Sequence, residues 1–458
     1  NLRVSAASLK RDGLLTNDLP GAPNKELETK DREVLLTHLQ WEPTESISVR
    51  YSYDRTRIDE IPQPQMITLT NPDRPLGSVV SPYSNVEGDR PTAVLSNSPS
   101  FAELEADGHA VNISMDISAS LTLESITGYR ETWTGGLADD NAPLDLLNAF
   151  TSQSVDSLTQ EFRLIGNAFD NRLDYSIGAF YMDEEGWLNS GIEVFGNSSS
   201  TTAKFDNRNW ALYGQATYVL AEKWDVTAGL RYTEEAREMT KSESSAPDRI
   251  YPKANRDFDN LSPMVSVGYA WNEDVNTYFK VSTGFQSGGF NSRDVAIEDF
   301  IAGFDEETLT SYELGIKATS ADRRFRVNAA YFFSDYDDKR VSNFNPQTLG
   351  NVVRNAGVVE IQGLELEVLA HLTESLQVGF DYGYTDPEYK EYTTFNSDGM
   401  PVDLADKTNF PYTPEHDMHA FLSYEFSGLD FGLLRARLDW SYKSERSFIV
   451  VQPEYNTA

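Results

Sequence analysis

The sequence predicts an all-β fold, a large antiparallel up-and-down transmembrane β-barrel. Three observations lead to this prediction. Apolar and polar side chains alternate along most of the chain, the connections between the alternating segments are short and long in turn, and tryptophan stands near the segment ends. A period of two residues places alternate side chains on opposite faces of a strand, and no comparably long stretch has helical spacing.

The alternation recurs in roughly seventeen segments of about 10–14 residues, longer than the usual strand of a soluble sheet. In one segment the apolar side chains are Trp224, Val226, Ala228, Leu230 and Tyr232, with polar or small residues between them. A strand rises about 3.3 Å per residue, so about 10–11 tilted residues cross the core of a bilayer. The predicted strand length therefore fits a membrane. Other segments of this kind cover residues 47–53, 111–120, 173–181, 312–318, 324–333, 376–385 and 434–442.

The connections alternate in length, and this predicts which end of the sheet each one occupies. Consecutive connections of an antiparallel up-and-down sheet emerge at opposite ends, so all short turns share one end and all long loops share the other. This asymmetry is typical of outer-membrane barrels, which have short periplasmic turns and long extracellular loops. The short connections are 42–45, 167–172, 221–223, 271–274, 320–323, 371–374 and 427–430, and the long ones are 10–31, 58–108, 134–154, 189–207, 238–257, 287–308, 337–356 and 388–410.

The charged residues of the alternating segments are predicted to face a wet interior. An Arg or Lys that faces lipid at mid-membrane costs about 2–4 kcal/mol, whereas both signs of charge can pair across an inner wall. These residues are Arg231, Lys280, Glu313, Lys317, Arg324, Arg326, Glu365, Glu367, Asp381, Arg435, Arg437 and Asp439. One residue fits poorly: Pro263 lies inside a predicted strand, so we expect a bulge or a later strand start there.

Composition excludes several classes of protein. The 458 residues carry a formal net charge of −34, which argues against a nucleic-acid partner because phosphate binding needs a basic face. Cysteine is absent, so disulfides and thiolate metal sites are excluded. No run approaches about 18 apolar residues, which excludes a helical membrane protein.

No motif predicts catalysis. The sequence lacks HExxH, GxSxG, a Walker loop and GxGxxG, so we predict neither an enzyme nor a cofactor. His416 and His419 are three residues apart, which places them on opposite faces of a strand and argues against a shared metal. The acidic run 305–307 and the group at 335–338 lack the spacing of a calcium loop, so solvated loop charge is the preferred interpretation.

Several short runs, in this order and spacing, resemble the β-barrel of TonB-dependent outer-membrane receptors. They are 159–164, 213–218, 227–233, 284–291, 311–317, 355–357 and 363–367, and the resemblance extends through most of the chain. It implies a barrel of about 22 strands around a plug, and uptake of a scarce ligand driven by the inner-membrane TonB complex. Residues 1–458 are then one partial barrel domain. The plug, the TonB box and the last strands are expected to lie outside this sequence, so no energy-coupling residue is assigned.

The resemblance also implies partners and a location. We expect the outer membrane of a Gram-negative bacterium, contact with its lipid and lipopolysaccharide, the TonB protein through a segment outside this sequence, and a small ligand such as a ferric siderophore. Candidate ligand-binding residues are Phe285, Gln286, Phe290, Asn291 and Arg293, because aromatic and polar groups converge on one loop after a strand. The alternative interpretation of this loop is a structural buttress.

Two other functions stay open at this point. A passive porin or a lipid-handling barrel would share the alternation, and a porin would have an unplugged lumen with a large conductance. A soluble binding or adhesion protein, such as a propeller, would need blade repeats of about 40 residues, which the sequence does not contain.

Overall fold

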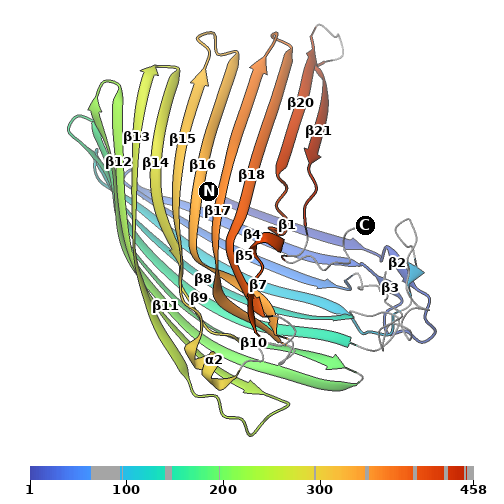
Figure 1. Cartoon of the computed structure of the whole chain (residues 1–458). Helices are drawn as coiled ribbons and strands as arrows, with labels where there is room; N and C mark the ends of the chain where they lie inside the picture. The colour runs from blue at the N-terminus through green and yellow to red at the C-terminus, as the bar shows by residue number, and fades with distance from the viewer. Residues whose placement is uncertain are drawn as a thin grey trace.

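The computed structural model describes residues 1–62, 93–94, 96–139, 147–194, 196–292, 296–345, 350–395, 400–427, 432–447 and 450. Within these ranges nearly all of the chain is antiparallel strand. Figure 1 shows the strands side by side in one strongly curved wall. Among the described residues no helix combines the length and the apolar character that a membrane crossing requires.

The wall is an 18-stranded sheet in which the three-residue β19 is a short addition to β18, and this confirms the predicted strand number. Each long strand pairs with the next long strand along the chain, as in an up-and-down sheet. The wall has free edges at β1 and β21, since no ladder joins these two strands within the described ranges. The strands are β1 (Leu2–Arg11), β4 (Lys30–Thr44), β5 (Ile47–Glu60), β7 (Phe101–Ser118), β8 (Leu121–Asp139), β9 (Leu147–Ala168), β10 (Leu173–Val194), β11 (Asn197–Ala221), β12 (Trp224–Glu243), β13 (Ala254–Asn272), β14 (Val275–Gln286), β15 (Glu307–Thr319), β16 (Phe325–Asn345), β17 (Gly350–His371), β18 (Leu376–Phe395), β19 (Pro401–Asp403), β20 (His416–Phe426) and β21 (Leu434–Lys443).

Five short elements lie outside the wall. The short strands β2 (Leu15–Asn17), β3 (Glu26–Leu27) and β6 (Ala93–Val94) form a separate small sheet around buried Leu15 and Leu27. The helix α2 (Ile297–Ala302) and the 3₁₀ turn η2 (Ala405–Lys407) belong to the connections that follow β14 and β18.

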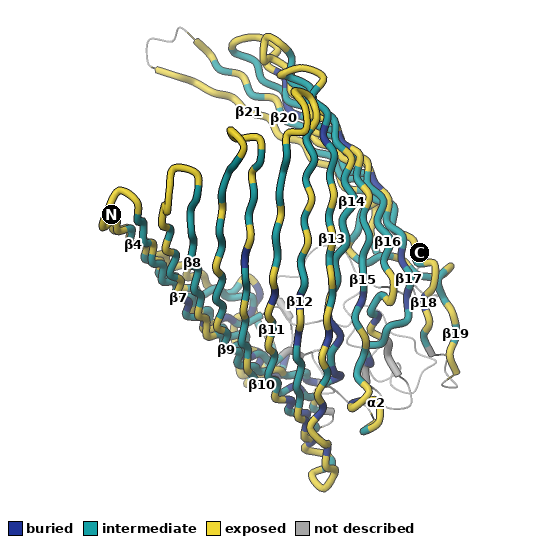
Figure 2. Tube along the Cα trace, turned by 90° about the vertical axis from the view of Figure 1, so that its left-hand side faces the viewer, coloured by how far each residue is buried: buried dark blue, intermediate teal, exposed yellow. Residues whose placement is uncertain are grey.

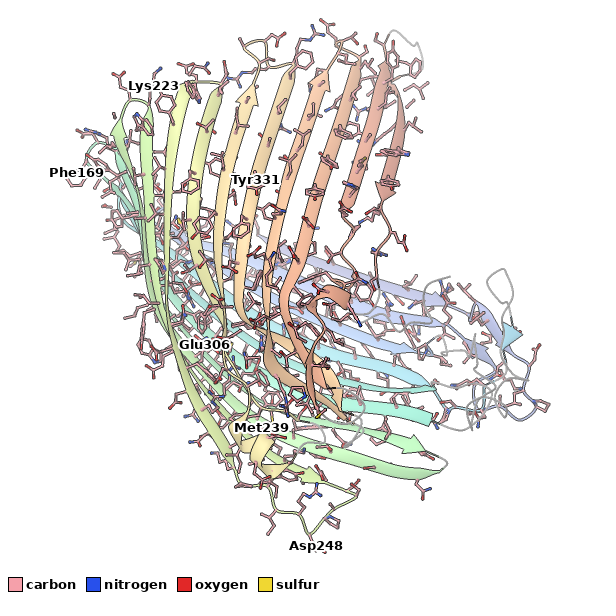
Figure 3. All side chains as sticks on the ribbon, viewed as in Figure 1. Phe169, Lys223, Met239, Asp248, Glu306 and Tyr331 are labelled. Atoms are coloured by element: carbon pink, nitrogen blue, oxygen red, sulfur yellow. The ribbon has the colours of Figure 1, made fainter. Side chains whose placement is uncertain are left out.

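Short and long connections occupy opposite ends of the wall, as predicted. Figure 3 places Phe169 and Lys223, which belong to short turns, at one end, and Asp248, in the connection between β12 and β13, at the other. Tyr331 lies between these ends. We refer to them below as the short-turn end and the long-loop end.

The strands are longer than the alternation predicts. β10 has 22 residues and β11 has 25, and only two residues separate them. The prediction of a long loop at 189–207 is therefore wrong: Ser190 pairs with Thr201 within a continuous ladder. The polar composition of this stretch predicts a loop, but both faces of a strand can be polar where it leaves the membrane. The middle of the predicted loop 58–108 lies outside the described residues, and β7 begins at its far end.

One face of the wall carries exposed apolar side chains. Leu314 is 57% exposed, Leu230 is 50% exposed and Tyr331 is 47% exposed. Leu314 lies directly opposite Tyr331 and Phe279 in neighbouring ladders, so the apolar positions are continuous from strand to strand. Figure 2 shows that exposed residues recur along the strands as well as at the turns. This is the arrangement of a lipid-facing surface, and we call it the outer face.

The apolar part of the outer face forms a belt next to the short turns. It runs from Trp210 to Leu220 on β11 and from Trp224 to Tyr232 on β12, after which charged residues follow. About 10 residues per strand match the thickness of a bilayer core. The strands then continue beyond this apolar belt toward the long-loop end, which explains their extra length.

Aromatic rings mark both borders of the apolar belt. Near the short turns Trp224 packs on Tyr269 with ring centroids 4.6 Å apart, and Tyr269 packs edge-on against Trp271. At the other border Trp210 packs against Tyr232 at 5.6 Å. Amphipathic rings prefer the interface between lipid and water, so these pairs fit two aromatic girdles.

The opposite, inner face carries the predicted ion pairs. Lys280 Nζ lies 2.7 Å from Glu313 of the neighbouring strand, and Asn328 donates to Glu367 at 3.0 Å. Arg437 binds Asp439 on β21. Charges of both signs thus pair along a polar surface, as expected for the wall of a water-filled lumen.

The expectation at Pro263 is wrong, because β13 runs through this residue without a bulge. Pro263 lies opposite Leu230 of β12, and β13 pairs with β14 only from Met264 onward. Proline has no N–H group to donate to a ladder. Because Pro263 stands just before the ladder with β14 begins, the missing hydrogen bond destabilises the sheet little.

Candidate ligand site at the long-loop end

The connection between β14 and β15 folds back over the inner face instead of extending away from the wall. Its described parts, Ser287–Ser292 and Ala296–Phe304, are called the inner segment below. Gly289 and Phe304 exchange backbone hydrogen bonds of 3.0 and 2.9 Å, which close the segment into a loop. A side chain at Gly288 would collide with the Phe304 carbonyl and the Phe258 ring, so only glycine fits there.

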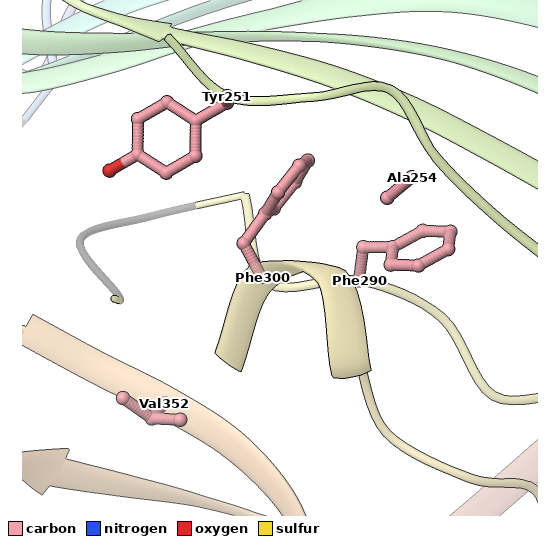
Figure 4. Close-up of a cluster of buried hydrophobic side chains, with 5 residues drawn as sticks. All are labelled: Tyr251, Ala254, Phe290, Phe300 and Val352. Atoms are coloured by element: carbon pink, nitrogen blue, oxygen red, sulfur yellow. The ribbon is translucent and has the colours of Figure 1, made fainter. Parts of the chain in front are cut away.

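A cluster of buried apolar side chains fixes the inner segment to the wall. Phe290 and Phe300 of the segment pack with Tyr251 and Ala254, which precede or begin β13, and with Val352 of β17 (Figure 4). Phe300 is fully buried, and its ring meets Tyr251 edge-on at 5.4 Å. The segment therefore crosses the inner side of the wall from β13 to β17.

A buried lysine extends this cluster. The Nζ atom of Lys241 lies 4.6 Å from the Tyr251 ring centroid and 5.9 Å from that of Phe300. Glu243 balances the buried charge, with an oxygen 3.1 Å from Lys241 Nζ, and also accepts a hydrogen bond from the Tyr251 hydroxyl. Burial, followed by the bond to Glu243, raises the pKa of Tyr251, so its hydroxyl stays a donor at neutral pH.

Polar contacts tie the start of the inner segment to strands on either side. The Ser287 hydroxyl donates to Glu235 at 2.7 Å and accepts from Arg237 at 2.9 Å, and both partners belong to β12. Arg340 of β16 donates to the Ser287 carbonyl at 3.2 Å. Arg340 and Lys339 also bind Glu307, at 3.4 and 3.1 Å.

The next residues are held by a two-point contact to β17. The side-chain amide of Asn291 donates to the Val353 carbonyl at 3.1 Å, and its oxygen accepts from the Val353 N–H at 2.8 Å. Near the end of the segment, Arg256 donates to the Ala302 carbonyl at 3.0 Å and pairs with Asp305. These contacts cover both of its described parts.

Acidic groups gather where the inner segment enters β15. Burial, and then the charges of Asp259, Asp305 and Asp338, raise the pKa of Glu306. Figure 3 shows Glu306 toward the long-loop end, on the same side of the wall's midpoint as Met239. The carboxylates give this rim a local excess of negative charge beside the basic residues that hold Glu307.

The predicted ligand-binding residues do not all converge on one surface. Phe285 and Gln286 end β14, where Phe285 shares the outer face of Phe279 while Gln286 is exposed. Phe290 and Asn291 are buried and contact β17 and the aromatic cluster. Arg293 lies outside the described residues. Ligand contact at this loop stays a prediction, and the packing of Phe290 and Asn291 agrees with the buttress interpretation.

Sequence patterns did not single out the residues that complete this region. Lys241, Tyr251 and Phe300 lie in stretches predicted as polar loops, and they come together only through the fold. One available signal is the group of apolar residues Ile297, Phe300 and Phe304 within a stretch predicted as a polar loop, which suggests a buried position.

The two neighbouring histidines lie on opposite faces, as their spacing predicts. His416 contacts Tyr382 at 3.0 Å and stacks on its ring, while His419 lies between Asp381 and Asp439 at 3.3 and 3.5 Å. Among the described residues no group of three or more His, Asp or Glu side chains has the arrangement of a metal site.

Comparison with known proteins gives a family match over most of the chain. Residues 67–457 match the family described as TonB dependent receptor-like, beta-barrel. The chain is 24% identical to the pesticin receptor of Yersinia pestis over 213 residues, which are 45% of this chain and 30% of that protein. It is 25% identical to the ferrioxamine B receptor of Salmonella typhimurium over 217 residues, or 46% of this chain and 27% of the relative.

A solved structure supports the fold over nearly the whole chain. The ferric yersiniabactin uptake receptor FyuA from Yersinia pestis superposes with a TM-score of 0.76 at 17% identity, covering 96% of this chain and 63% of that one. The chain thus spans less than two thirds of the relatives that it matches. Members of the matched family are β-barrels of the Gram-negative outer membrane, and the apolar belt, the girdles and the polar inner face fit that location. The chain belongs to the TonB-dependent receptor β-barrel family.

Proposed function

We propose that the full-length protein imports a scarce small ligand, such as a ferric siderophore, across the outer membrane with energy from the inner-membrane TonB complex. The observation that carries this proposal is the family match over residues 67–457. The names of the relatives add support, since they include receptors for ferrioxamine B and for ferric yersiniabactin. TonB would act through a segment outside this chain.

We further propose that the ligand docks at the long-loop end, on the surface around the inner segment. Gln286 is exposed there, and Arg237 and Arg340 are partly exposed beside it. In this scheme Phe290 and Asn291 keep the surface in place and Arg293 remains a candidate contact, whereas Phe285 shares the outer face of Phe279 and lies on the other side of the wall. A mixed surface of aromatic and charged groups suits a small polar ligand.

Uptake by the full-length protein tests the proposal. Cells that lack their own siderophore receptors and express it would be supplied with a panel of radiolabelled ferric siderophores, with and without TonB. The proposal expects uptake of at least one ligand that stops when TonB is deleted. Uptake that persists without TonB, together with a large single-channel conductance, would instead support the porin alternative.

The docking surface can be tested separately by binding. Gln286→Ala should weaken binding of the imported ligand, whereas Gln377→Ala, at the short-turn end of β18, should leave it unchanged. Equal affinities for both variants would place the ligand elsewhere, without affecting the proposal of TonB-dependent import.

A further inference from the structure

The inner face of the wall has a hollow at its short-turn end, which we call the first hollow. Its volume is about 700 Å³, within the range of sites that hold small molecules. Its walls come mainly from inward positions of β7 to β11. Ser176 is one of them, and it alternates with the outward Ile177, which is 56% exposed. The first hollow therefore opens into the lumen and not toward lipid.

Neutral polar groups dominate the lining of the first hollow. Its charged groups are Asp116, which accepts a 2.8 Å hydrogen bond from Thr122, and Asp174, and no Lys or Arg lines it. Hydroxyl and amide side chains both donate and accept hydrogen bonds, so they suit a polar ligand in more than one orientation. The neutral members are Thr122, Asn167, Ser176, Gln215 and Thr217.

A second hollow lies on the same strands, farther toward the long-loop end. Its volume is about 270 Å³, and its lining includes Ala110 of β7, Gly128 of β8 and Thr159 of β9. Gly128 stands six residues beyond Thr122 of the first hollow, so the two hollows are about 20 Å apart at about 3.3 Å per residue. Together they follow a line along β7, β8 and β9 at the level of the apolar belt.

Arg163 lies on this line, between the two hollows. It occupies an inward position of β9 opposite Glu124 of β8. Its Nε atom is 3.6 Å from Glu124 and 3.8 Å from Glu161, which is longer than a hydrogen bond. This buried atom has no hydrogen-bond partner among the described residues. An unsatisfied buried donor costs free energy, so Arg163 favours a passing group that supplies an oxygen.

The inner face from β14 to β21 has a different chemistry, because its charged side chains bind one another. Lys280 lies 2.7 Å from Glu313. His419 lies between Asp381 and Asp439, at 3.3 and 3.5 Å. A polar ligand on that side would compete with existing ion pairs, whereas the hydroxyl and amide groups of the first hollow exchange hydrogen bonds without breaking one.

We propose that the imported ligand crosses the lumen along β7, β8 and β9, from the second hollow to the first, and that Arg163 contacts it between them. The guanidinium group donates to oxygens of the ligand, and the neutral lining of the first hollow then releases it toward the short turns. The proposal rests on the proposed function, and adds to it the side of the wall on which transport takes place.

Thiol labelling of the full-length protein tests the route. Residues 1–458 contain no cysteine, and any cysteine elsewhere in the full-length protein would first be replaced by serine. Ser176→Cys would place a thiol in the first hollow, where a bulky methanethiosulfonate reagent should react with it. Uptake of the ferric siderophore that the wild type imports fastest should then fall on the order of tenfold, with unchanged binding, because the label occupies volume that the ligand needs.

Ser423→Cys is the matched control. Like Ser176 it is an inward serine three residues from the short-turn end of its strand, but it lies on β20, which Figure 1 shows far along the curved wall from β10. Labelled Ser423→Cys should import at the wild-type rate. Equal uptake by labelled and unlabelled Ser176→Cys, or equal loss in both labelled variants, would overturn the route.

The thiol reaction itself gives a result that needs no import. A Ser176→Cys thiol that stays unlabelled in the folded protein would show that the first hollow is filled, and would overturn the route. Heat-modifiable migration on gels would confirm that each variant is folded. Absence of uptake by the wild type would instead be a failure of the proposed function, so the two failures are distinguishable.

The contact with Arg163 has its own test. Arg163→Gln should slow uptake on the order of fivefold without weakening ligand binding, because a charge-assisted contact is lost. Arg163→Lys keeps the charge and should restore part of the rate. Arg435→Gln, the control, removes an arginine that already binds Glu425 at 2.9 Å on β20, and should import as the wild type. Unchanged uptake by Arg163→Gln, or an equal loss in Arg435→Gln, would contradict this contact.

Discussion

The ring of Tyr278 lies across Gly315, the residue directly opposite it in the β14–β15 ladder, and its hydroxyl donates a 2.6 Å hydrogen bond to Glu313. Glu313 also accepts from Lys280 at 2.7 Å. The glycine leaves a gap on the inner face, and the aromatic ring fills it. The same relation joins Gly178 to Tyr213, Gly363 to Phe332 and Gly379 to Phe421.

Gly315→Ala should destabilise the wall by about 1–3 kcal/mol, because the new methyl group would displace the Tyr278 ring and its bond to Glu313. Urea unfolding in detergent would measure the change. Gly383→Ala is the control, since a methyl group there meets no atom within 4 Å and should change stability by less than about 0.5 kcal/mol. Equal effects of the two substitutions would show that the packing of the Tyr278 ring does not require glycine at position 315.

Leu314→Arg should impair membrane assembly by about 2–4 kcal/mol, because it places a charge in the apolar belt between Phe279 and Tyr331. Folding into lipid vesicles, followed by gel mobility, would report the loss. Thr310→Arg, on the same face of β15 but opposite Asp335, should be tolerated. Efficient assembly of Leu314→Arg would contradict the outer-face assignment.

Phe300→Ala should release the inner segment, because it removes a fully buried ring that packs on Tyr251. The truncation of a buried phenylalanine costs about 3–5 kcal/mol, which here acts on a local contact. Limited proteolysis should then cut near 296–304 at least tenfold faster while the wall stays intact. Ile301→Ala changes a 46% exposed neighbour on the same helix and should behave as the wild type.

Glu306→Gln should stabilise the protein at neutral pH. The folded state raises the pKa of Glu306 through burial and through Asp259, Asp305 and Asp338, so ionisation favours the unfolded chain as the pH rises above the ordinary value of 4.5. The variant should therefore have a higher melting temperature at pH 7, and the difference should disappear below about pH 4. A difference that stays constant over this range would exclude a charge effect.

The fold was predictable because a membrane imposes a strict period. Wherever lipid faces one side of a strand, alternation is sharp, as in Trp224, Val226 and Ala228 of β12. Beyond the apolar belt both faces meet water and the period fades, so the sequence predicts a loop where Ser190 in fact pairs with Thr201. The bulge expected at Pro263 is absent for a different reason. The ladder between β13 and β14 begins only at Met264, so the strand accepts a proline just before it.

The candidate site was less predictable, because its contacts join segments far apart in the sequence. The run 284–291 draws attention to the connection after β14, but nothing local indicates that Asn291 binds the backbone of Val353, 62 residues away. Lys241 is a similar case, since a lysine in a polar run is ordinarily solvated. Its burial depends on Tyr251 and Phe300, which only the folded loops bring to it.

The continuation of β10 and β11 past the apolar belt determines how far the tip of their hairpin stands from the membrane. About ten further residues at 3.3 Å each, tilted near 45°, raise the hairpin tip on the order of 20 Å above the hydrocarbon. A peptide tag inserted at Gly196, in the turn between these strands, would thus stand clear of neighbouring headgroups on a stiff extension of the sheet, in which β9 pairs with β10 up to Val194. Antibodies could label that tip on living cells without touching the bilayer or blocking the channel mouth beside it.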